Sequence, residues 1–208
     1  MDARGIIPEF SGVLCHDHWK PYYNYDKLLH SLCNAHHSRE LIRADEQDGQ
    51  LWAKEMDELL QAINNAVHDA GGALDDINTK DYRQQYRDLL TRAEKECPPP
   101  KEEEKEKGKR GRQKRSKSRN LLERLINYED DVLRFMSDPQ VPFTNNQGEN
   151  DIRMTKVQQK ISGCFRCWDG ANIFCRIRGY LSTCQKHGVS SSEAMRLLFA
   201  GKLPEFAT

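Results

Sequence analysis

The sequence predicts an α+β fold that tends to mostly helical, with one short strand near the start and helices after it. Three patterns support this prediction. The segment from Phe10 to His16 is a short apolar run that ends at Asp17, which is typical of a buried strand. Between Trp52 and Val67, and again between Leu121 and Met136, apolar residues recur at helical spacing.

Helices are expected in order along the chain. His18 to Tyr23 contains a proline and ends the strand. Helical patterns then cover residues 33–43, 52–67, 82–93 and 121–136. Gly71 and Gly72 end the second of these helices, and three consecutive prolines from Pro98 stop the third. Pro139 and Pro142 set an extended turn after the fourth.

Three more helices complete the predicted fold. One opens at Asn145–Glu149 and runs to about Ile161, and a second covers Ala171 to Lys186. A short third helix opens at Ser190, which forms a plausible capping box with Glu193.

Composition sets limits on the class of protein. With 208 residues, the chain is long enough for one domain or for a core with an inserted subdomain. No apolar run approaches the roughly 20 residues that span a bilayer, and the first residues lack an apolar signal region. Seven cysteines without a secretion signal favour reduced thiols. We therefore expect a cytoplasmic protein with no membrane segment.

Charge is uneven along the chain. Lys and Arg (32) balance Asp and Glu (32), but acid dominates residues 45–81, and Lys105 to Arg119 is almost entirely basic. The stretch at about 98–119 is low in complexity, so we predict a disordered loop there. This loop could also hold DNA phosphates non-specifically. A neutral total charge therefore does not exclude nucleic acid as a partner.

Two carboxylates stand out as candidate metal ligands. Asp17 follows the predicted strand, where α/β sheets place their ligands, although an aspartate can also simply cap a turn there. Glu149 shares a helical face with Arg153, Lys156 and Lys160, which suits binding a metal and the adjacent phosphates. A capping box with Asn146, or a solvated charged face, would produce the same pattern.

Cys33 and His36 form a C-x2-H pair near the start of the first long helix. Together with the cysteines and histidines at 15–18 and 164–167 they could form a zinc site. The spacing between these groups is much longer than in compact zinc modules, so a packing or hydrogen-bonding role is the simpler interpretation.

These elements together resemble the DDE transposases of the insertion sequence sixty-six family. Blocks in the family's order cover nearly the whole chain: Gly12-Val-Leu-Cys-His-Asp-His-Trp-Lys-Pro-Tyr22, His30-Ser-Leu-Cys-Asn-Ala-His36 with Arg39-Glu-Leu41, Asn145-Asn-Gln-Gly-Glu-Asn-Asp-Ile-Arg153, Lys160-Ile-Ser-Gly-Cys-Phe-Arg166, Gly170-Ala171, and Arg178-Gly-Tyr-Leu-Ser-Thr183 to His187-Gly188. Each block is short, and their ordered sum is what makes the resemblance specific.

The resemblance implies a ribonuclease-H-like fold with a long helical insertion. Residues 1–37 would be part of the core and carry Asp17, 38–137 would be the insertion, and 138–208 would be core helices carrying Glu149. Asp17 matches the family's second catalytic aspartate and Glu149 its catalytic glutamate, so both are implied Mg²⁺ or Mn²⁺ ligands. Cys33 and His36 match the family's C-x2-H signature.

The resemblance also implies partners. DNA, both transposon ends and target, would be the substrate, and the full-length protein would be a homo-oligomer. Arg153 matches the cation that follows the glutamate by one turn, and Arg153, Lys156, Lys160 and Arg166 are the expected DNA contacts. Two divalent ions about 4 Å apart would support in-line phosphoryl transfer.

The sequence departs from the family at its start. The family's first catalytic aspartate lies on an earlier strand, whereas only 16 residues precede Asp17, and the acids among them, Asp2 and Glu9, have no strand pattern. We therefore expect an incomplete catalytic portion that lacks the first strands and shows little strand transfer alone. The alternatives are a non-catalytic DNA-binding or regulatory fragment, a zinc-stabilised helical module, and a non-functional remnant.

Overall fold

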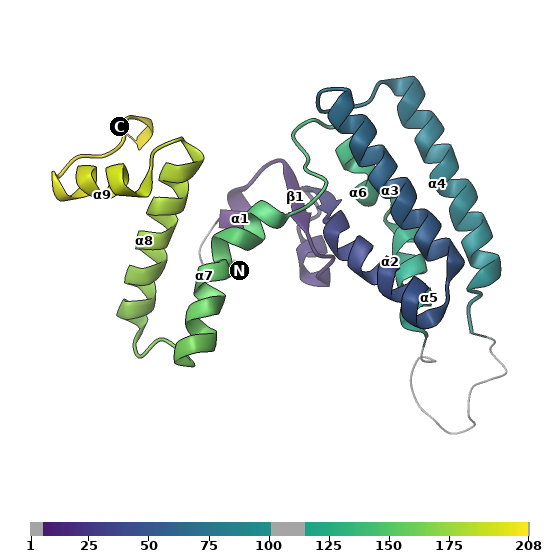
Figure 1. Ribbon diagram of the computed structural model, residues 1–208, viewed down its shortest axis with the longest axis horizontal. Coiled ribbons are helices and arrows are strands. Elements are labelled where there is room, and N and C mark those ends of the chain that lie inside the picture. Colours follow the sequence, from purple (N-terminus) through teal and green to yellow (C-terminus); the bar gives the residue numbers. More distant parts are fainter. Residues whose placement is uncertain (1–5, 101–114, 208) are drawn as a thin grey trace. The chain divides into compact units, whose positions relative to one another are not determined.

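The computed structural model describes residues 6–100 and 115–207 of the chain (Figure 1). The chain divides into two compact units, unit 1 over Met1–Asn145 and unit 2 over Asn146–Thr208. Unit 1 contains a small sheet and a helical bundle, and unit 2 contains helices. The domain bounds predicted at 37 and 137 stay a prediction.

A parallel pair of strands forms the sheet of unit 1. β1 (Val13–His16) pairs with β2 (Leu29–Leu32), in a register that sets Cys15 opposite Ser31. Backbone bonds extend the pairing at both ends, from Leu29 N to the Gly12 carbonyl (3.1 Å) and from Cys33 N to the His16 carbonyl (2.9 Å). The predicted strand is confirmed, and β2 is a strand that the sequence pattern did not reveal.

Short helical turns flank the strands. α1 (Ile6–Glu9) precedes β1, and a 3-10 turn, η2 (Lys20–Asn24), lies in the crossover to β2. Pro21 stands at the start of η2, where its fixed φ suits the first helical positions. The crossover from His16 to Leu29 is short, so Asp17 at its start is close in sequence to both strands of the sheet.

Four helices form the bundle, and Figure 1 shows them side by side. They are α2 (Asn34–Asp48), α3 (Leu51–Asp69), α4 (Asp76–Glu96) and α5 (Lys117–Asn127). α3 packs between α2 and α4, and α5 packs against α2 and α4. The apolar residues at helical spacing are buried between them, among them Leu41, Met56, Leu60, Ile63, Tyr86, Leu121, Leu122 and Leu125.

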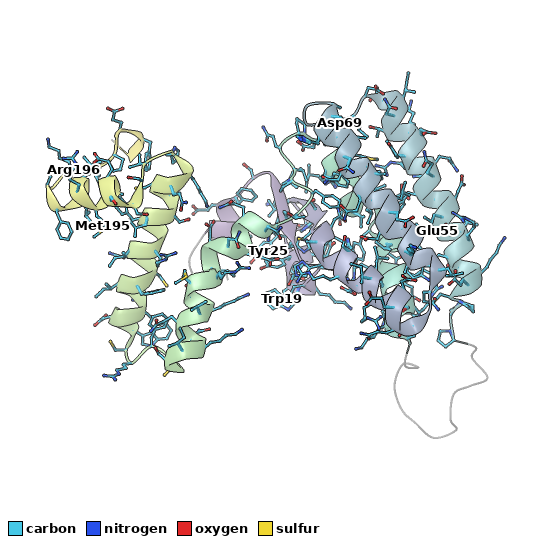
Figure 2. All side chains as sticks on the ribbon, viewed as in Figure 1. Trp19, Tyr25, Glu55, Asp69, Met195 and Arg196 are labelled. Carbon is cyan, nitrogen blue, oxygen red and sulfur yellow. The ribbon has the colours of Figure 1, made fainter. Side chains whose placement is uncertain are left out.

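The ends of the bundle helices follow local chemistry. Asp75 caps α4 by accepting the N–H groups of Ile77 and Asn78, and Ser116 caps α5 by accepting that of Arg119. Gly49 ends α2 in the left-handed conformation (φ 65°) that glycine adopts without strain. Charged side chains such as Glu55 (Figure 2) lie on the outside of the bundle, and Glu55 of α3 pairs with Arg92 of α4 at 2.8 Å.

Arg119 joins the end of α4 to the start of α5. This nearly buried guanidinium donates to the Cys97 carbonyl (2.9 Å) and lies 3.4 Å from Glu94 and 3.1 Å from Glu123. Most of the loop predicted at about 98–119 lies outside the described residues. Its end comes earlier than predicted, because Ser116 starts α5 at Lys117.

α6 (Glu129–Leu133) and the turn η4 (Arg134–Met136) connect the bundle to the sheet. α6 packs against β2, and Arg134 Nε donates to the His30 carbonyl (2.7 Å). Bundle and sheet therefore share one core, which includes Leu32 of β2 and Val132 of α6.

Unit 2 consists of α7 (Asn146–Ser162), α8 (Trp168–Lys186), α9 (Ser191–Phe199) and the turn η5 (Glu205–Ala207). α8 begins three residues before its predicted start, because the Cys167 Sγ caps it by accepting the Gly170 N–H. Ser190 caps α9 through the Glu193 N–H, which is one half of the predicted capping box, while the Glu193 carboxylate accepts from Arg196 instead. Few of the described side chains here are buried, Cys184 and Ala194 being examples.

The described part of the chain is mostly helical with a two-stranded sheet, so the predicted α+β class is confirmed. The finer ribonuclease-H-like assignment stays a prediction. Within the described ranges, no helix combines the length and the apolar character needed to cross a membrane.

Candidate functional site

Asp17 lies immediately after β1, at the carboxyl end of the parallel strand pair. Its side chain is exposed, and its Oδ1 accepts the backbone N–H of Trp19 at 3.2 Å. This bond closes the turn after β1, which is the capping role that an aspartate at a strand end can also have. The carboxyl end of parallel strands is where sheets of this kind place ligands.

The turn after Asp17 has unusual backbone geometry. His18 has a left-handed φ of 68°, and it is the only non-glycine residue with positive φ among those described. Its backbone N–H donates to Nδ1 of His16 at 3.1 Å, which holds the turn. Strained conformations of this kind persist where the surroundings enforce them, often at functional sites.

The imidazole of His18 packs edge-on against Tyr128, with ring centroids 4.5 Å apart. Within the described residues, its Nε2 is buried without a hydrogen-bond partner. Burial first, and the nearby Arg124 and Lys20 second, lower the pKa of His18 to about 4. The ring is therefore uncharged at neutral pH and does not neutralise the neighbouring carboxylate of Asp17.

A group of buried histidines and half-buried tyrosines packs around the end of β1. Nε2 of His16 lies 3.2 Å from Nδ1 of His30, and Tyr23 donates its hydroxyl to Asp131 at 2.9 Å. Burial, followed by the nearby His30, lowers the pKa of His16 to about 4. Burial and the Asp131 carboxylate raise the pKa of Tyr23. His16 and Tyr23 are therefore uncharged at neutral pH, and their rings contact each other at the end of β1.

Cys33 and His36 lie at the start of α2, directly after β2. Cys33 is 1% exposed, and its Sγ accepts the backbone N–H of Asn145 at 3.1 Å. The next residue, Asn34, donates its backbone N–H to the Phe143 carbonyl (3.0 Å) and its side-chain amide to the Val132 carbonyl (3.0 Å). The start of α2 therefore binds the segment that ends unit 1.

Glu149 lies in the first turn of α7, in unit 2. The helix covers Asn146–Ser162, which confirms the helix predicted from about 145 to 161. The predicted capping box requires Asn146 to precede the helix. In the structure Asn146 is already the first residue of α7, so the prediction is wrong at this point. Arg153, Lys156 and Lys160 are exposed and follow Glu149 at intervals of four, three and four, so they lie on its face of the helix.

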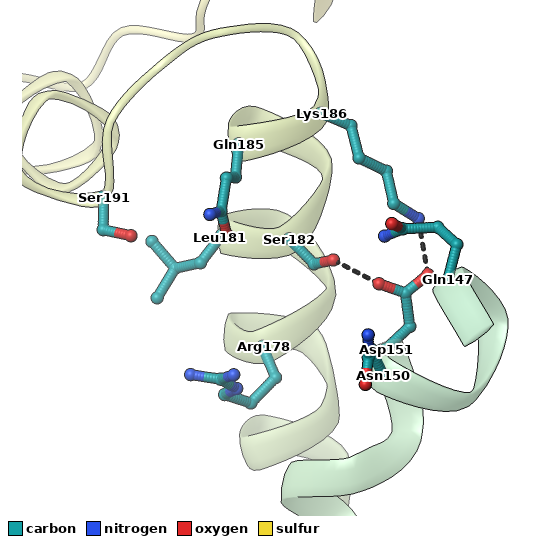
Figure 3. A pocket seen from close by; sticks show the side chains of 9 residues that line it. All are labelled: Gln147, Asn150, Asp151, Arg178, Leu181, Ser182, Gln185, Lys186 and Ser191. Carbon is teal, nitrogen blue, oxygen red and sulfur yellow. Dashed lines mark hydrogen bonds and ion pairs between the residues drawn. The ribbon is translucent and has the colours of Figure 1, made fainter.

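Arg166 is exposed in the turn between α7 and α8. Further along α8, a polar pocket of about 400 Å³ lies within unit 2 (Figure 3). Its lining includes Arg178 and Gln185, as well as Asp151, which bonds Ser182 (2.7 Å) and Lys186 (2.5 Å). Hydrogen bonds from Lys186 and then from Ser182 lower the pKa of Asp151. The same two bonds connect α7 to α8.

The structure thus places Asp17, Cys33 and His36 in unit 1, and Glu149, Arg153, Lys156, Lys160 and Arg166 in unit 2. It brings Asp17 and Cys33 to one sheet, since the Cys33 N–H donates to the carbonyl of His16, next to Asp17. The pairing of Asp17 with Glu149 stays a prediction. The left-handed His18 and the contacts of Asn34 carried no signal in the sequence.

Comparison with known proteins identifies the class of protein as a transposase. A family model described as Transposase IS66 family matches residues 2–173, which is more than half of the chain. The chain belongs to the Transposase IS66 family. This finding confirms the resemblance that the ordered sequence blocks predicted.

One curated relative has no described activity. The uncharacterized protein y4jO of Sinorhizobium fredii (strain NBRC 101917 / NGR234) is 36% identical over 70 residues, which make up 34% of this chain and 22% of that protein. The chain thus matches about a fifth of the length of this relative. No solved structure matches the chain.

Proposed function

We propose that this chain acts in DNA transposition and that Asp17 and Glu149 are two of the carboxylates of a metal-dependent DNA strand-transfer site. The observation that carries the proposal is the position of Asp17. It is an exposed carboxylate, whose Oδ1 accepts the Trp19 N–H, at the carboxyl end of a parallel strand pair in a member of a transposase family.

The residues fit Mg²⁺ or Mn²⁺ in their chemistry. Both candidate ligands are carboxylates, and hard oxygen ligands suit these ions. Bound ions of this class stabilise the attacking and the leaving oxygen of an in-line phosphoryl transfer.

The reaction proposed for the whole protein has two steps. In the first, water attacks a phosphorus atom at the transposon end, a new P–O bond forms, and the bond to the 3′ oxygen breaks to leave a 3′-hydroxyl. In the second, that hydroxyl attacks a phosphorus atom of target DNA and displaces another 3′ oxygen. The exposed Arg153, Lys156 and Lys160 would hold phosphates beside the carboxylates.

Calorimetric binding of Mn²⁺ to the full chain tests the metal site. We expect the wild type to bind Mn²⁺ and both Asp17→Asn and Glu149→Gln to weaken binding by more than the roughly 10- to 100-fold that loss of an outer-sphere partner costs. Asp26→Asn and Glu193→Gln, which alter carboxylates elsewhere in each unit, should bind as the wild type does.

Two results would overturn the shared metal site. One is a wild type that binds no Mn²⁺. The other is binding that survives in both Asp17→Asn and Glu149→Gln. DNA affinity that persists without Mn²⁺ binding would instead support the alternative of a DNA-binding fragment without catalysis.

A further inference from the structure

Cys33 has two backbone partners that belong to two different stretches of unit 1. Its N–H donates to the carbonyl of His16 (2.9 Å), and its Sγ accepts the N–H of Asn145 (3.1 Å). His16 precedes Asp17, and Asn145 precedes Glu149 by four residues. We call these two bonds the Cys33 link.

We propose that Cys33 is a positioning residue that fixes the segment leading to Glu149 against the strand end that carries Asp17. This inference rests on the function proposed above and gives the C-x2-H motif a structural role in it. Whatever fixes Asn145 also limits the positions available to Glu149, because only three residues lie between them. A metal site built from two distant parts of the chain needs such a constraint, since its ligands must be held in place before the ion binds.

The surroundings of Cys33 favour a fixed link. Cys33 and Asn34 are 1% and 0% exposed, so water does not compete for their bonds. Asn34 adds a bond beside the link, from its N–H to the carbonyl of Phe143. The ring of Phe143 packs edge-on against Phe135 (centroids 4.8 Å apart), which seats the segment on the core.

The sulfur itself is not needed to start α2. Cys33 stands at the N-cap position, but its side chain makes no capping hydrogen bond. Its backbone is extended (φ −69°, ψ 106°), a conformation that valine and serine also adopt. The side chain can therefore be replaced while the helix and the strand pairing keep their backbone bonds.

Three variants of the full chain separate the link from packing. Cys33→Val keeps a side chain of similar size and removes the acceptor, whereas Cys33→Ser keeps an acceptor. Cys15→Val is the matched control, because Cys15 lies on β1 of the same sheet, opposite Ser31. The measurements are amide exchange at Asn145 by NMR, Mn²⁺ binding by calorimetry, and the urea midpoint.

We expect Cys33→Val to speed exchange at Asn145 and to weaken Mn²⁺ binding, each by about three- to tenfold, the range for one lost hydrogen bond. Its urea midpoint should fall only as far as the loss of one hydrogen bond explains, and Cys33→Ser should restore exchange, Mn²⁺ affinity and the midpoint toward wild type. A general loss of packing would not produce this rescue.

Opposite results would overturn the proposal. Unchanged exchange and Mn²⁺ affinity in Cys33→Val would show that the link does not position the segment. Stoichiometric zinc in the purified protein, lost in both Cys33→Val and Cys33→Ser, would assign the thiol to a metal instead. If the wild type binds no Mn²⁺, the proposed function fails by itself, and unchanged Asn145 exchange in Cys33→Val would still overturn the link separately.

Discussion

Nδ1 of His37 lies 2.9 Å from Oδ1 of Asn34, and both side chains are buried in unit 1. The Asn34 amide donates to the Val132 carbonyl, so its oxygen faces the ring and accepts a hydrogen bond from Nδ1. The first turn of α2 is thereby bound to α6. A histidine in this position must stay neutral, which has a consequence for stability.

Lowering the pH should destabilise unit 1 through His37. Burial first, and Arg124 second, lower its pKa to about 3 from an ordinary value of 6.5. Between these two pH values the unfolded state binds more protons than the folded state. The stability that neutral His37 contributes is therefore complete above pH 6.5 and is lost as the pH drops toward 3. The fall is on the order of 1 kcal/mol per pH unit.

Urea midpoints measured at pH 7.5 and 5.5 check this prediction. The non-titrating His37→Gln should show a smaller difference between the two pH values than the wild type. His68→Gln, which alters an exposed histidine of α3, should behave as the wild type. An equal pH dependence in wild type and His37→Gln would contradict the prediction.

Removing the hydroxyl of Tyr86 should destabilise the bundle by about 1–2 kcal/mol, because it leaves a buried acceptor without its donor. Tyr86 is fully buried in α4, and its hydroxyl donates to the Leu125 carbonyl of α5 at 3.0 Å. The free energy of unfolding of Tyr86→Phe, measured in urea, checks this. The partly exposed Tyr82→Phe is the control and should differ from wild type by less than about 0.5 kcal/mol.

The exposed cations of α7 should contribute to DNA binding through phosphates. Changing Arg153, Lys156 and Lys160 together to Gln should weaken binding to a short mixed-sequence duplex and reduce the slope of log K against log salt by about one per charge. Fluorescence anisotropy over a salt series measures both. The control with Lys54, Lys80 and Lys95 changed to Gln removes three exposed cations from α3 and α4, and an equal effect there would argue against a specific face.

Asp151→Asn should loosen unit 2. The Asp151 carboxylate on α7 accepts hydrogen bonds from Ser182 and Lys186 on α8. Because the Asp151 side chain is 30% exposed, its ion pair with Lys186 stabilises unit 2 by at most about 1 kcal/mol. We expect faster proteolysis within residues 146–207, with the urea midpoint of the bundle unchanged. Asp169→Asn, at the exposed start of α8, should be cleaved at the wild-type rate.

The sequence predicted most of the fold that has a clear periodicity, although the stripe expected over 121–136 is divided at Tyr128 into α5, α6 and η4. The stripe from Trp52 to Val67 became α3 and is largely buried, whereas the run that ends at Asp17 became β1, whose apolar residues are only half-buried. β2 was not predicted, since its four residues include His30 and Ser31, whose burial depends on partners outside the strand. A strand of this length is too short for alternation to be seen.

The candidate site was predictable only in part. Asp17 could be placed at a strand end because strand and residue are adjacent in sequence. The bond between Cys33 and Asn145 joins residues 112 positions apart, and no local pattern encodes a contact at that separation. The left-handed turn at His18 was likewise not predicted, because its bond to His16 and its packing against Tyr128 exist only in the folded chain.

The contact of Arg119 with the Cys97 carbonyl bears on how this chain can change in length. This bond holds the end of α4 beside the start of α5 independently of the covalent connection between them. We therefore expect a reporter inserted between these two points to leave the packing of the four helices intact, at a place remote in sequence from both Asp17 and Glu149.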